Sequence, residues 1–182
     1  MAKAKGTVMV GLVKALRRNK DKARELLPPK LAHYLEERIV VASWYPIEDY
    51  IVLLRTVGKV LPNPNGDVYV EMGRAAARDH MEGTYSRLKK SVNRQAAFTL
   101  LTSMYDTGEM KVLERAPGHA LVEWLGFAMP TREVCETFTG YQAQRMEMQG
   151  FEDVSVRHVR CRAEGGSSCR WDLSWKGSKA NL

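Results

Sequence analysis

Near its C-terminus the chain reads Val156-Arg-His-Val-Arg-Cys161-Arg-Ala-Glu-Gly-Gly-Ser-Ser-Cys169-Arg-Trp171. The seven residues between the two cysteines include a pair of glycines, so we expect them to turn back as a hairpin loop. Such a loop joins two antiparallel strands and brings both sulfur atoms to one end of the hairpin. The segment therefore predicts the last two strands of a sheet together with a pair of neighbouring thiols.

The residues on either side of this loop alternate between apolar and polar side chains, which is the pattern of half-buried strands. Before the loop, a strand over residues 153–160 would carry on one face Val154, Val156 and His158. After it, the inward face would carry Cys169, Trp171, Leu173 and Trp175.

The three cysteines of this 182-residue chain all lie in its last third, and a histidine accompanies them: Cys135, His158, Cys161 and Cys169. Thiolate sulfur and imidazole nitrogen are donors that zinc prefers, and four of them complete a tetrahedron. We therefore predict a zinc site in which Cys135 arrives from a separate element. Four protein ligands leave no position open for water, so the predicted site is structural.

Other interpretations of the cysteines stay open. The three cysteines could simply be buried in the core, because a free cysteine behaves as a small hydrophobic residue. Cys161, with His158 three residues away and arginines at 157, 160 and 162, also has the surroundings of a reactive thiol. A disulfide framework is not favoured, because the cysteines are few and odd in number. A small number of unpaired cysteines is typical of a protein in a reducing compartment, so we expect a cytoplasmic protein.

Three motifs surround these residues: Cys135-x4-Gly140-Tyr141, Gly150-Phe151 and Val156-x-His158-x2-Cys161-x3-Gly165-x3-Cys169-x-Trp171. On these motifs, the segment 44–175 resembles the 4-vinyl reductase-like small-molecule-binding domain, a relative of the haem–nitric oxide/oxygen-binding domain, and the chain is identified as a stand-alone bacterial member. In the related sensor domains of aromatic-responsive transcription activators, three cysteines and a glutamate hold a structural zinc. The resemblance implies the same site here, with His158 at the glutamate position.

The fold class expected is α+β, with an antiparallel sheet packed against helices. Helices are predicted over residues 1–24, 30–40, 47–60, 68–82, 94–106 and 130–149, and strands over 110–115, 119–127, 153–160 and 169–175. We expect one domain over 1–182, with a basic N-terminal helix at 1–24, a family core at 44–175 and a flexible tail at 177–182.

Charge is concentrated at the N-terminus. The first 24 residues hold eight basic residues and one acidic residue, which equals the whole net charge of +7. Such a segment can bind nucleic acid or an anionic membrane surface. Its apolar residues at helical spacing, Val8, Leu12 and Leu16, favour instead a helix that packs on the domain or forms a homodimer. We therefore expect no nucleic-acid binding, and no apolar run is long enough to span a membrane.

No catalytic motif accompanies the fold. The sequence lacks a nucleophile elbow, a zinc-protease helix, a phosphate loop and a dinucleotide-binding turn, so we expect no enzyme. The function that the resemblance implies is a sensory or ligand-binding module for a small hydrophobic or aromatic molecule. The alternative is a protein–protein interaction or assembly scaffold without a ligand.

The resemblance places the ligand between the helices and the sheet. The aromatic and methionine residues that could line such a pocket, or else simply fill the core, are joined by one histidine: Trp44, Tyr45, Phe98, Met104, Tyr105, His119, Trp124, Phe127 and Phe138. In the aromatic sensors a histidine and a tryptophan hold the ligand hydroxyl, and His80, His119 and Trp124 are the residues of those types near enough to be considered.

Haem is expected to be unlikely. The related gas-sensing domain fixes the haem propionates with Tyr-x-Ser-x-Arg, whereas this chain has Tyr141-Gln-Ala-Gln-Arg145, with alanine in place of serine. The nearest histidine upstream is His119, which does not match the family's spacing.

Overall fold

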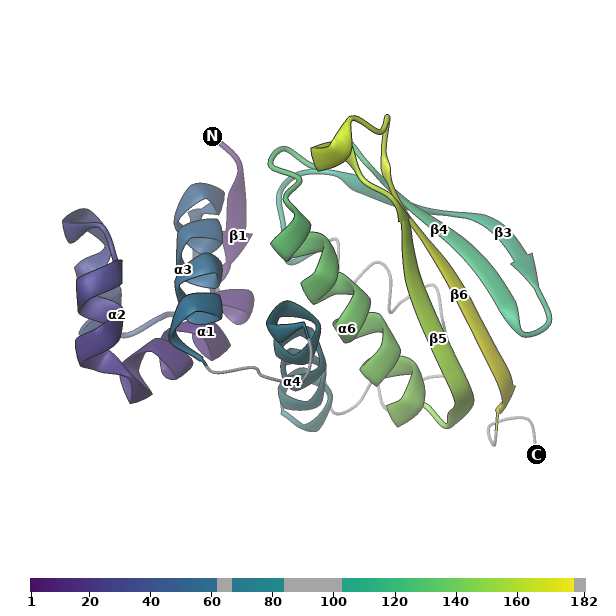
Figure 1. The fold of residues 1–182 in the computed structure, drawn as a ribbon, viewed down its shortest axis with the longest axis horizontal. Coiled ribbons are helices and arrows are strands. Elements are labelled where there is room, and N and C mark those ends of the chain that lie inside the picture. The colour runs from purple at the N-terminus through teal and green to yellow at the C-terminus, as the bar shows by residue number, and fades with distance from the viewer. Residues whose placement is uncertain (62–66, 84–102, 179–182) are drawn as a thin grey trace.

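A computed structural model describes residues 1–61, 67–83 and 103–178. Figure 1 shows helices α1, α2 and α3 grouped at one side of the molecule and a four-stranded sheet at the other, with α4 and α6 between them. The predicted α+β architecture, with an antiparallel sheet packed against helices, is confirmed. The helix predicted over 94–106 lies outside the described residues as far as residue 102, and so does Phe98. Its described part, residues 103–106, is not helical, because the backbone there bridges to the N-terminal strand, with Tyr105 opposite Ala4.

The N-terminal segment differs from the single helix that its sequence predicts. It begins with strand β1 (Lys3–Lys5) and continues with α1 (Gly6–Arg18) and α2 (Lys20–Leu26). β1 pairs antiparallel with β2 (Trp44–Pro46), a contact across forty residues that no local pattern indicates. The apolar stripe of α1 is buried within the chain: Met9, Leu12, Val13 and Leu16.

The helix predicted over 30–40 is also different. Pro28 and Pro29 restrict the backbone, and a 3-10 helix, η1 (Pro29–Leu35), replaces an α-helix. The chain then runs through turns to β2. Helix α3 (Ile47–Val60) follows Pro46 as predicted, and its buried face fills the centre of the helical half.

Helix α4 (Val68–Glu82) matches the helix predicted over 68–82, and Asp67 caps its N-terminus. The Asp67 carboxylate accepts hydrogen bonds from the backbone N–H groups of Tyr69 and Val70 at 2.8 and 3.3 Å. Helix α6 (Arg132–Met148) is capped in the same way by the Thr131 hydroxyl.

Helices α4 and α6 cross in close contact, because glycines lie at the crossing. A Cβ on Gly73 would lie 1.9 Å from the Thr137 carbonyl oxygen, and a Cβ on Gly140 would lie 1.9 Å from the Val70 carbonyl oxygen. Neither position tolerates a side chain, so both glycines set the distance between the helices.

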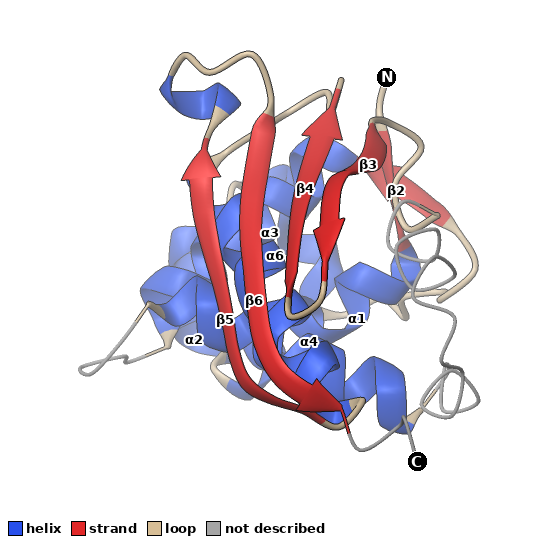
Figure 2. Cartoon of the chain, turned by 90° about the vertical axis from the view of Figure 1, so that its right-hand side faces the viewer, coloured by secondary structure: helices blue, strands red, loops and turns tan. Residues whose placement is uncertain are grey.

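The sheet comprises β3 (Glu109–Ala116), β4 (His119–Leu125), β6 (Cys169–Ser178) and β5 (Phe151–Arg160), in that order and all antiparallel. The hairpin predicted around Cys161 and Cys169 is confirmed by the β5–β6 pair, and β3 and β4 lie in the two segments predicted as strands. Figure 2 shows the sheet in front with the helices behind it, so that one face is covered and the other is not. Since β6 extends to Ser178, the first two residues of the predicted tail belong to a strand.

Helix α6 packs on the covered face, where Trp171 is fully buried. The largest fully buried side chains come from both halves of the chain, and they include Trp171, Phe127, Met9, Leu16, Leu53 and Leu54. Among the described residues, no helix combines the length and the apolar character needed to cross a bilayer.

Candidate metal centre and ligand cavity

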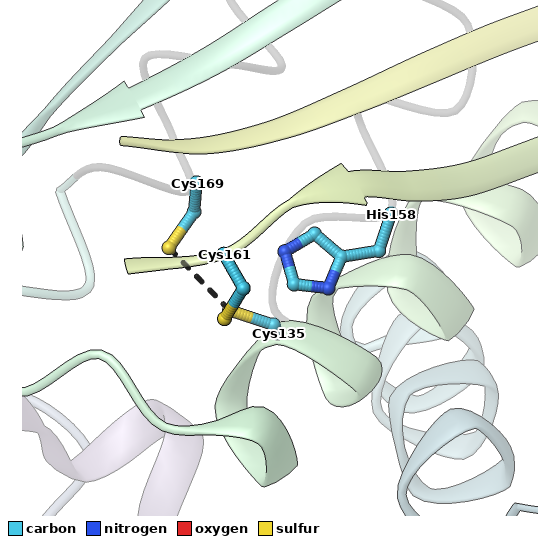
Figure 3. A group of neighbouring side chains, drawn as sticks. All are labelled: Cys135, His158, Cys161 and Cys169. Carbon is cyan, nitrogen blue, oxygen red and sulfur yellow. Dashed lines mark hydrogen bonds between the residues drawn. The ribbon is translucent and has the colours of Figure 1, made fainter. Parts of the chain in front are cut away.

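The structure brings the four predicted metal ligands together (Figure 3). Cys135 lies in the first turn of α6, His158 near the end of β5, Cys161 directly after β5, and Cys169 at the start of β6. Their ligand atoms all lie within 4.8 Å of one another.

The distances between the sulfur atoms match tetrahedral zinc. The Cys135 Sγ lies 3.6 Å from the Cys169 Sγ and 4.0 Å from the Cys161 Sγ. Zinc–sulfur bonds of about 2.3 Å in a tetrahedron separate the sulfurs by about 3.8 Å. All three cysteines are buried free thiols, so the site has soft donors at the spacing that a zinc ion requires.

The loop between β5 and β6 is fixed by its own contacts. It contains the short 3-10 helix η3 (Arg162–Glu164), which ends at Gly165 with a φ of 87°, a left-handed conformation that favours glycine. Arg162 Nη1 donates a 2.6 Å hydrogen bond to the Phe127 carbonyl. On the other side of the loop, Ser168 Oγ donates to the Glu123 carboxylate at 2.5 Å. These contacts hold Cys161 and Cys169 in place.

His158 faces the three cysteines with a buried ring nitrogen. Its imidazole points toward the three sulfur atoms (Figure 3), and its Nε2 is buried without a hydrogen-bond partner among the described residues. A buried polar atom without a partner costs free energy, which a metal bond would recover.

The thiols are not electrostatically equivalent. The hydrogen bond donated by the Cys135 thiol lowers the pKa of Cys169 and favours its thiolate form. The same hydrogen bond and burial raise the pKa of Cys135, and burial raises the pKa of Cys161. A cation bound among the sulfurs would favour the thiolate form of all three.

A second feature of the molecule is a cavity of about 790 Å³. It is lined by residues of α1, α3, α4, α6 and β4 together with residues 104–105. Most of its lining is apolar, with Val8, Leu12, Val57, Met72, Val134 and Phe138 among the side chains.

The cavity lining also includes four charged residues: Lys14, Arg18, Asp79 and Glu82. Several of its neutral polar groups are paired with one another. The Tyr105 hydroxyl donates to the Tyr50 hydroxyl at 3.3 Å. His80 Nδ1 lies 3.4 Å from the Tyr141 hydroxyl, and His80 Nε2 lies 3.3 Å from the Thr7 carbonyl oxygen. Burial lowers the pKa of His80, so its ring is neutral at pH 7.

Trp124 adds a donor to the same cavity. Its side chain is buried, and its Nε1 has no hydrogen-bond partner among the described residues. Trp124 therefore adds a neutral hydrogen-bond donor to a cavity whose lining is mainly apolar.

The candidate ligand residues fall into two groups. Four line the cavity: Met104, Tyr105, Trp124 and Phe138. Four other described candidates do not line it: Trp44, Tyr45, His119 and Phe127. Phe127 is buried against Trp124, with ring centroids 4.2 Å apart, but does not line the cavity. Tyr45 packs on Tyr34.

Two candidates lie on the surface. Trp44 is 43% exposed at the start of β2. His119 lies on the uncovered face of the sheet, where its Nε2 is 3.0 Å from Asp172 Oδ1. Tyr50 and Tyr141 also line the cavity, although neither was among the candidate ligand residues. Tyr50 lies within the apolar stripe of its helix, and that position could have indicated an inward side chain.

No family model and no curated protein sequence matches the chain. Several solved structures, however, resemble it in fold. An unliganded Fe(II) H-NOX protein mutant from K. algicida has a TM-score of 0.65 at 10% identity, with 98% of each chain covered. An H-NOX protein from S. oneidensis has a TM-score of 0.65 at 12% identity and the same coverage. An oxygen-binding H-NOX domain related to soluble guanylate cyclases has a TM-score of 0.65 at 17% identity, with 96% of each chain covered.

The prediction that haem is unlikely is wrong, because the proteins that share this fold include haem proteins of the H-NOX family. The prediction rested on comparing Tyr141 to Arg145 with a propionate-binding motif. Those residues lie on one helix but do not share a site: Tyr141 lines the large cavity, whereas Arg145 lines a small space beside Phe151. The departure from that motif therefore gives no information on whether the cavity can hold haem.

The cavity fits haem in size and in its mainly apolar lining. His80 is the histidine among its described lining residues, and histidine is a common axial ligand of haem iron. Both nitrogens of His80 have protein contacts, so an iron bond would replace one of the two.

The structural likeness extends over both halves of the molecule, since it covers 96–98% of the chain. At identities of 10–17% it concerns the arrangement of the backbone. This chain therefore has the fold of the H-NOX domains.

Proposed function

We propose that this protein is a non-catalytic sensory module that binds a small, mainly apolar molecule in the cavity between α1, α4 and α6. The observation that carries the proposal is the cavity itself, whose volume of about 790 Å³ lies within the range of roughly 300–1,000 Å³ typical of small-molecule sites. A chain that served only as a scaffold would gain stability by filling this space.

The groups in the cavity suit recognition more than reaction. Burial raises the pKa of Tyr50 and of Tyr105, so both hydroxyls stay protonated at neutral pH. His80 is neutral for the same reason. Besides its charged lining residues Lys14, Arg18, Asp79 and Glu82, the cavity thus offers neutral donors and acceptors in a mainly apolar wall, which favours an aromatic or other hydrophobic ligand with one or two polar atoms.

Haem is one molecule of this class. His80 would be the candidate iron ligand, and bound haem would supply an iron centre that binds a diatomic gas. Phenols, fatty acids and isoprenoids are the other ligands that the lining supports. The cysteine spacing further supports a relation to the 4-vinyl reductase-like domains.

We further propose that Cys135, His158, Cys161 and Cys169 hold a structural zinc ion. The support is the donor set, the sulfur separations and the unpartnered His158 Nε2. Zinc would join the start of α6 to the β5–β6 hairpin. Since α6 also forms one wall of the cavity, the ion would fix that wall.

A ligand screen tests the cavity. The purified protein is heated with haem, phenols, fatty acids and isoprenoids, and a ligand present at about 100 times its dissociation constant should add roughly 2.7 kcal/mol of stability. Haem loading is read separately from its absorbance. Ala76→Phe, which places a ring in the cavity, should abolish the shift, whereas Ala128→Phe on an exposed loop should preserve it.

Absence of a shift with every class, combined with a stable complex with another protein, would favour the scaffold alternative. Native mass spectrometry of the same sample reports metal, retained ligand and oligomeric state together. The predicted homodimer stays a prediction, and the α1 stripe assigned to its contact is buried within the chain. The cytoplasmic location and the lack of nucleic-acid binding also stay predictions.

A further inference from the structure

Exposed apolar side chains are concentrated at one corner of the molecule. Among the described residues, seven large hydrophobic side chains are exposed, and three of them lie within five consecutive positions: Val40 at 51%, Val41 at 42% and Trp44 at 43%. A fourth, Met1, precedes the strand that pairs with Trp44. We call residues 38–44 the apolar loop.

The apolar loop is held in place by backbone hydrogen bonds. Gly6 N–H donates to the Ser43 carbonyl at 2.8 Å, and Thr7 N–H donates to the Val41 carbonyl at 3.1 Å. Within the loop, Ser43 N–H donates to the Val40 carbonyl at 3.0 Å. The chain thus orders these apolar side chains in a position where each keeps 42–51% of its surface exposed.

The charge around the apolar loop is positive. Residues 1–6 and 38–46, which together form this corner, contain Lys3, Lys5 and Arg38 and no acidic residue. The Lys5 ammonium lies over the Trp44 ring, 5.6 Å from its centroid. Acidic residues border the corner: Asp106 accepts a hydrogen bond from the Lys3 backbone, and Glu37 and Glu48 lie just outside the two segments.

The same loop reaches the ligand cavity. Val41 lines the cavity, although nearly half of its surface is exposed. Its carbonyl binds Thr7, and the Thr7 carbonyl in turn contacts His80 Nε2. The exposed apolar surface therefore continues into the cavity wall.

A second copy of this chain is a poor occupant for the surface. A stable dimer buries about 800 Å² on each partner, or roughly 20–30 residues, whereas this corner exposes a single short loop. A two-fold contact would also bring together the lysines and Arg38 of both copies. A bilayer has neither problem, because aliphatic side chains and tryptophan enter its interface while lysine and arginine meet anionic headgroups.

We propose that the apolar loop and strand β1 form a docking surface for an anionic lipid bilayer. Val40 and Trp44 enter the interface, and Lys3, Lys5 and Arg38 face the headgroups. This contact places the Val41 side of the cavity at the membrane, where apolar molecules are dissolved. The docking itself does not depend on which molecule the cavity binds.

The test is co-sedimentation of the full chain with vesicles of phosphatidylcholine alone and of phosphatidylcholine mixed with phosphatidylglycerol in equal parts. Binding is expected to the mixed vesicles, and added salt should weaken it. The variant Val40→Ser/Trp44→Ser should bind about tenfold more weakly, because two interfacial apolar groups are lost. Lys3→Glu/Lys5→Glu should also reduce binding to the mixed vesicles.

The matched control is Leu113→Ser/Val159→Ser, which removes two exposed apolar side chains from the sheet. It should bind as the unaltered chain does. Circular dichroism checks that each variant is folded. Lack of binding to both vesicle types, or equal binding by Val40→Ser/Trp44→Ser, overturns the proposal. So does a concentration-dependent dimer that this variant abolishes, because the loop would then be an interface between copies.

Discussion

The imidazole of His158 stacks on the indole of Trp171, with the ring centroids 4.9 Å apart and the ring planes 18° apart. The two residues are register partners on β5 and β6. The stack fixes the plane of the imidazole while its Nε2 stays buried without a partner among the described residues. A β-sheet pair thus orients one candidate ligand toward the sulfur atoms.

Trp171 is itself anchored to α6. Its Nε1 donates a 3.0 Å hydrogen bond to the Thr139 hydroxyl, which donates to the Cys135 carbonyl at 3.0 Å. A chain of contacts therefore runs from His158 through Trp171 and Thr139 to the backbone of Cys135. This arrangement is typical of the hydrogen-bonded support that surrounds metal ligands.

Zinc analysis is the first test of this centre. We expect one zinc ion per chain in protein purified without chelator, and Cys161→Ser should lower the melting temperature by about 10 °C, which corresponds to roughly 3–4 kcal/mol in a chain of this size. His33→Gln, at an exposed histidine, serves as the control and should change little. Protein without zinc whose three thiols all react freely would disprove the site.

Thr139→Val should destabilise the fold by about 1–3 kcal/mol, because the Trp171 N–H would lose its partner. Thr137→Val is the matched control. Both threonines donate to the carbonyl four residues earlier, but the indole bond belongs to Thr139. Urea unfolding of the two variants measures the difference, and equal losses would show that the indole bond contributes nothing.

Alanine at Gly73 or Gly140 should separate α4 from α6. A Cβ at either position would lie 1.9 Å from a backbone carbonyl oxygen, so each variant is expected to lose about 1–3 kcal/mol or more. Gly11→Ala is the control, since a Cβ there meets nothing within 4 Å, and it should be neutral or stabilising by up to about 1 kcal/mol. Thermal unfolding compares the three.

Local sequence patterns were sufficient to predict the sheet and to select four residues that lie close together. The alternation around Cys161 and Cys169 predicted both strands, and the helix predicted over 130–149 contains Cys135. Strict alternation also indicates the side of the sheet on which each residue lies. His119 is an odd number of positions from Trp124, so the two face opposite ways, and the parity alone argued against His119 as a cavity residue.

The helical half was harder to predict because its contacts are long-range. Pairing of β1 with β2 depends on residues forty positions apart. The contact of His80 with Tyr141 depends on how closely α4 and α6 approach. Gly73 and Gly140 allow this approach, but the sequence alone does not show that the two glycines face each other's helices. The cavity follows from such packing and has no motif of its own.

The pKa of His80 makes stability depend on pH. Burial lowers the pKa of this histidine in the folded chain below its ordinary value of about 6.5. Between the folded and the ordinary pKa, the unfolded chain binds the proton and the folded chain does not, so stability falls as the pH falls through this window. Above pH 7 the contribution is fully present. The slope from this one group is at most about 1.4 kcal/mol per pH unit.

Urea unfolding at pH 7.5 and at successively lower pH values down to 5 measures this slope. His80→Gln should flatten the profile, and it should also weaken any ligand that contacts the ring. His33→Gln removes an exposed histidine and should leave the slope unchanged. If the two variants give the same profile as the unaltered chain, then His80 is protonated equally in both states, and the cavity is more open to water than its burial indicates.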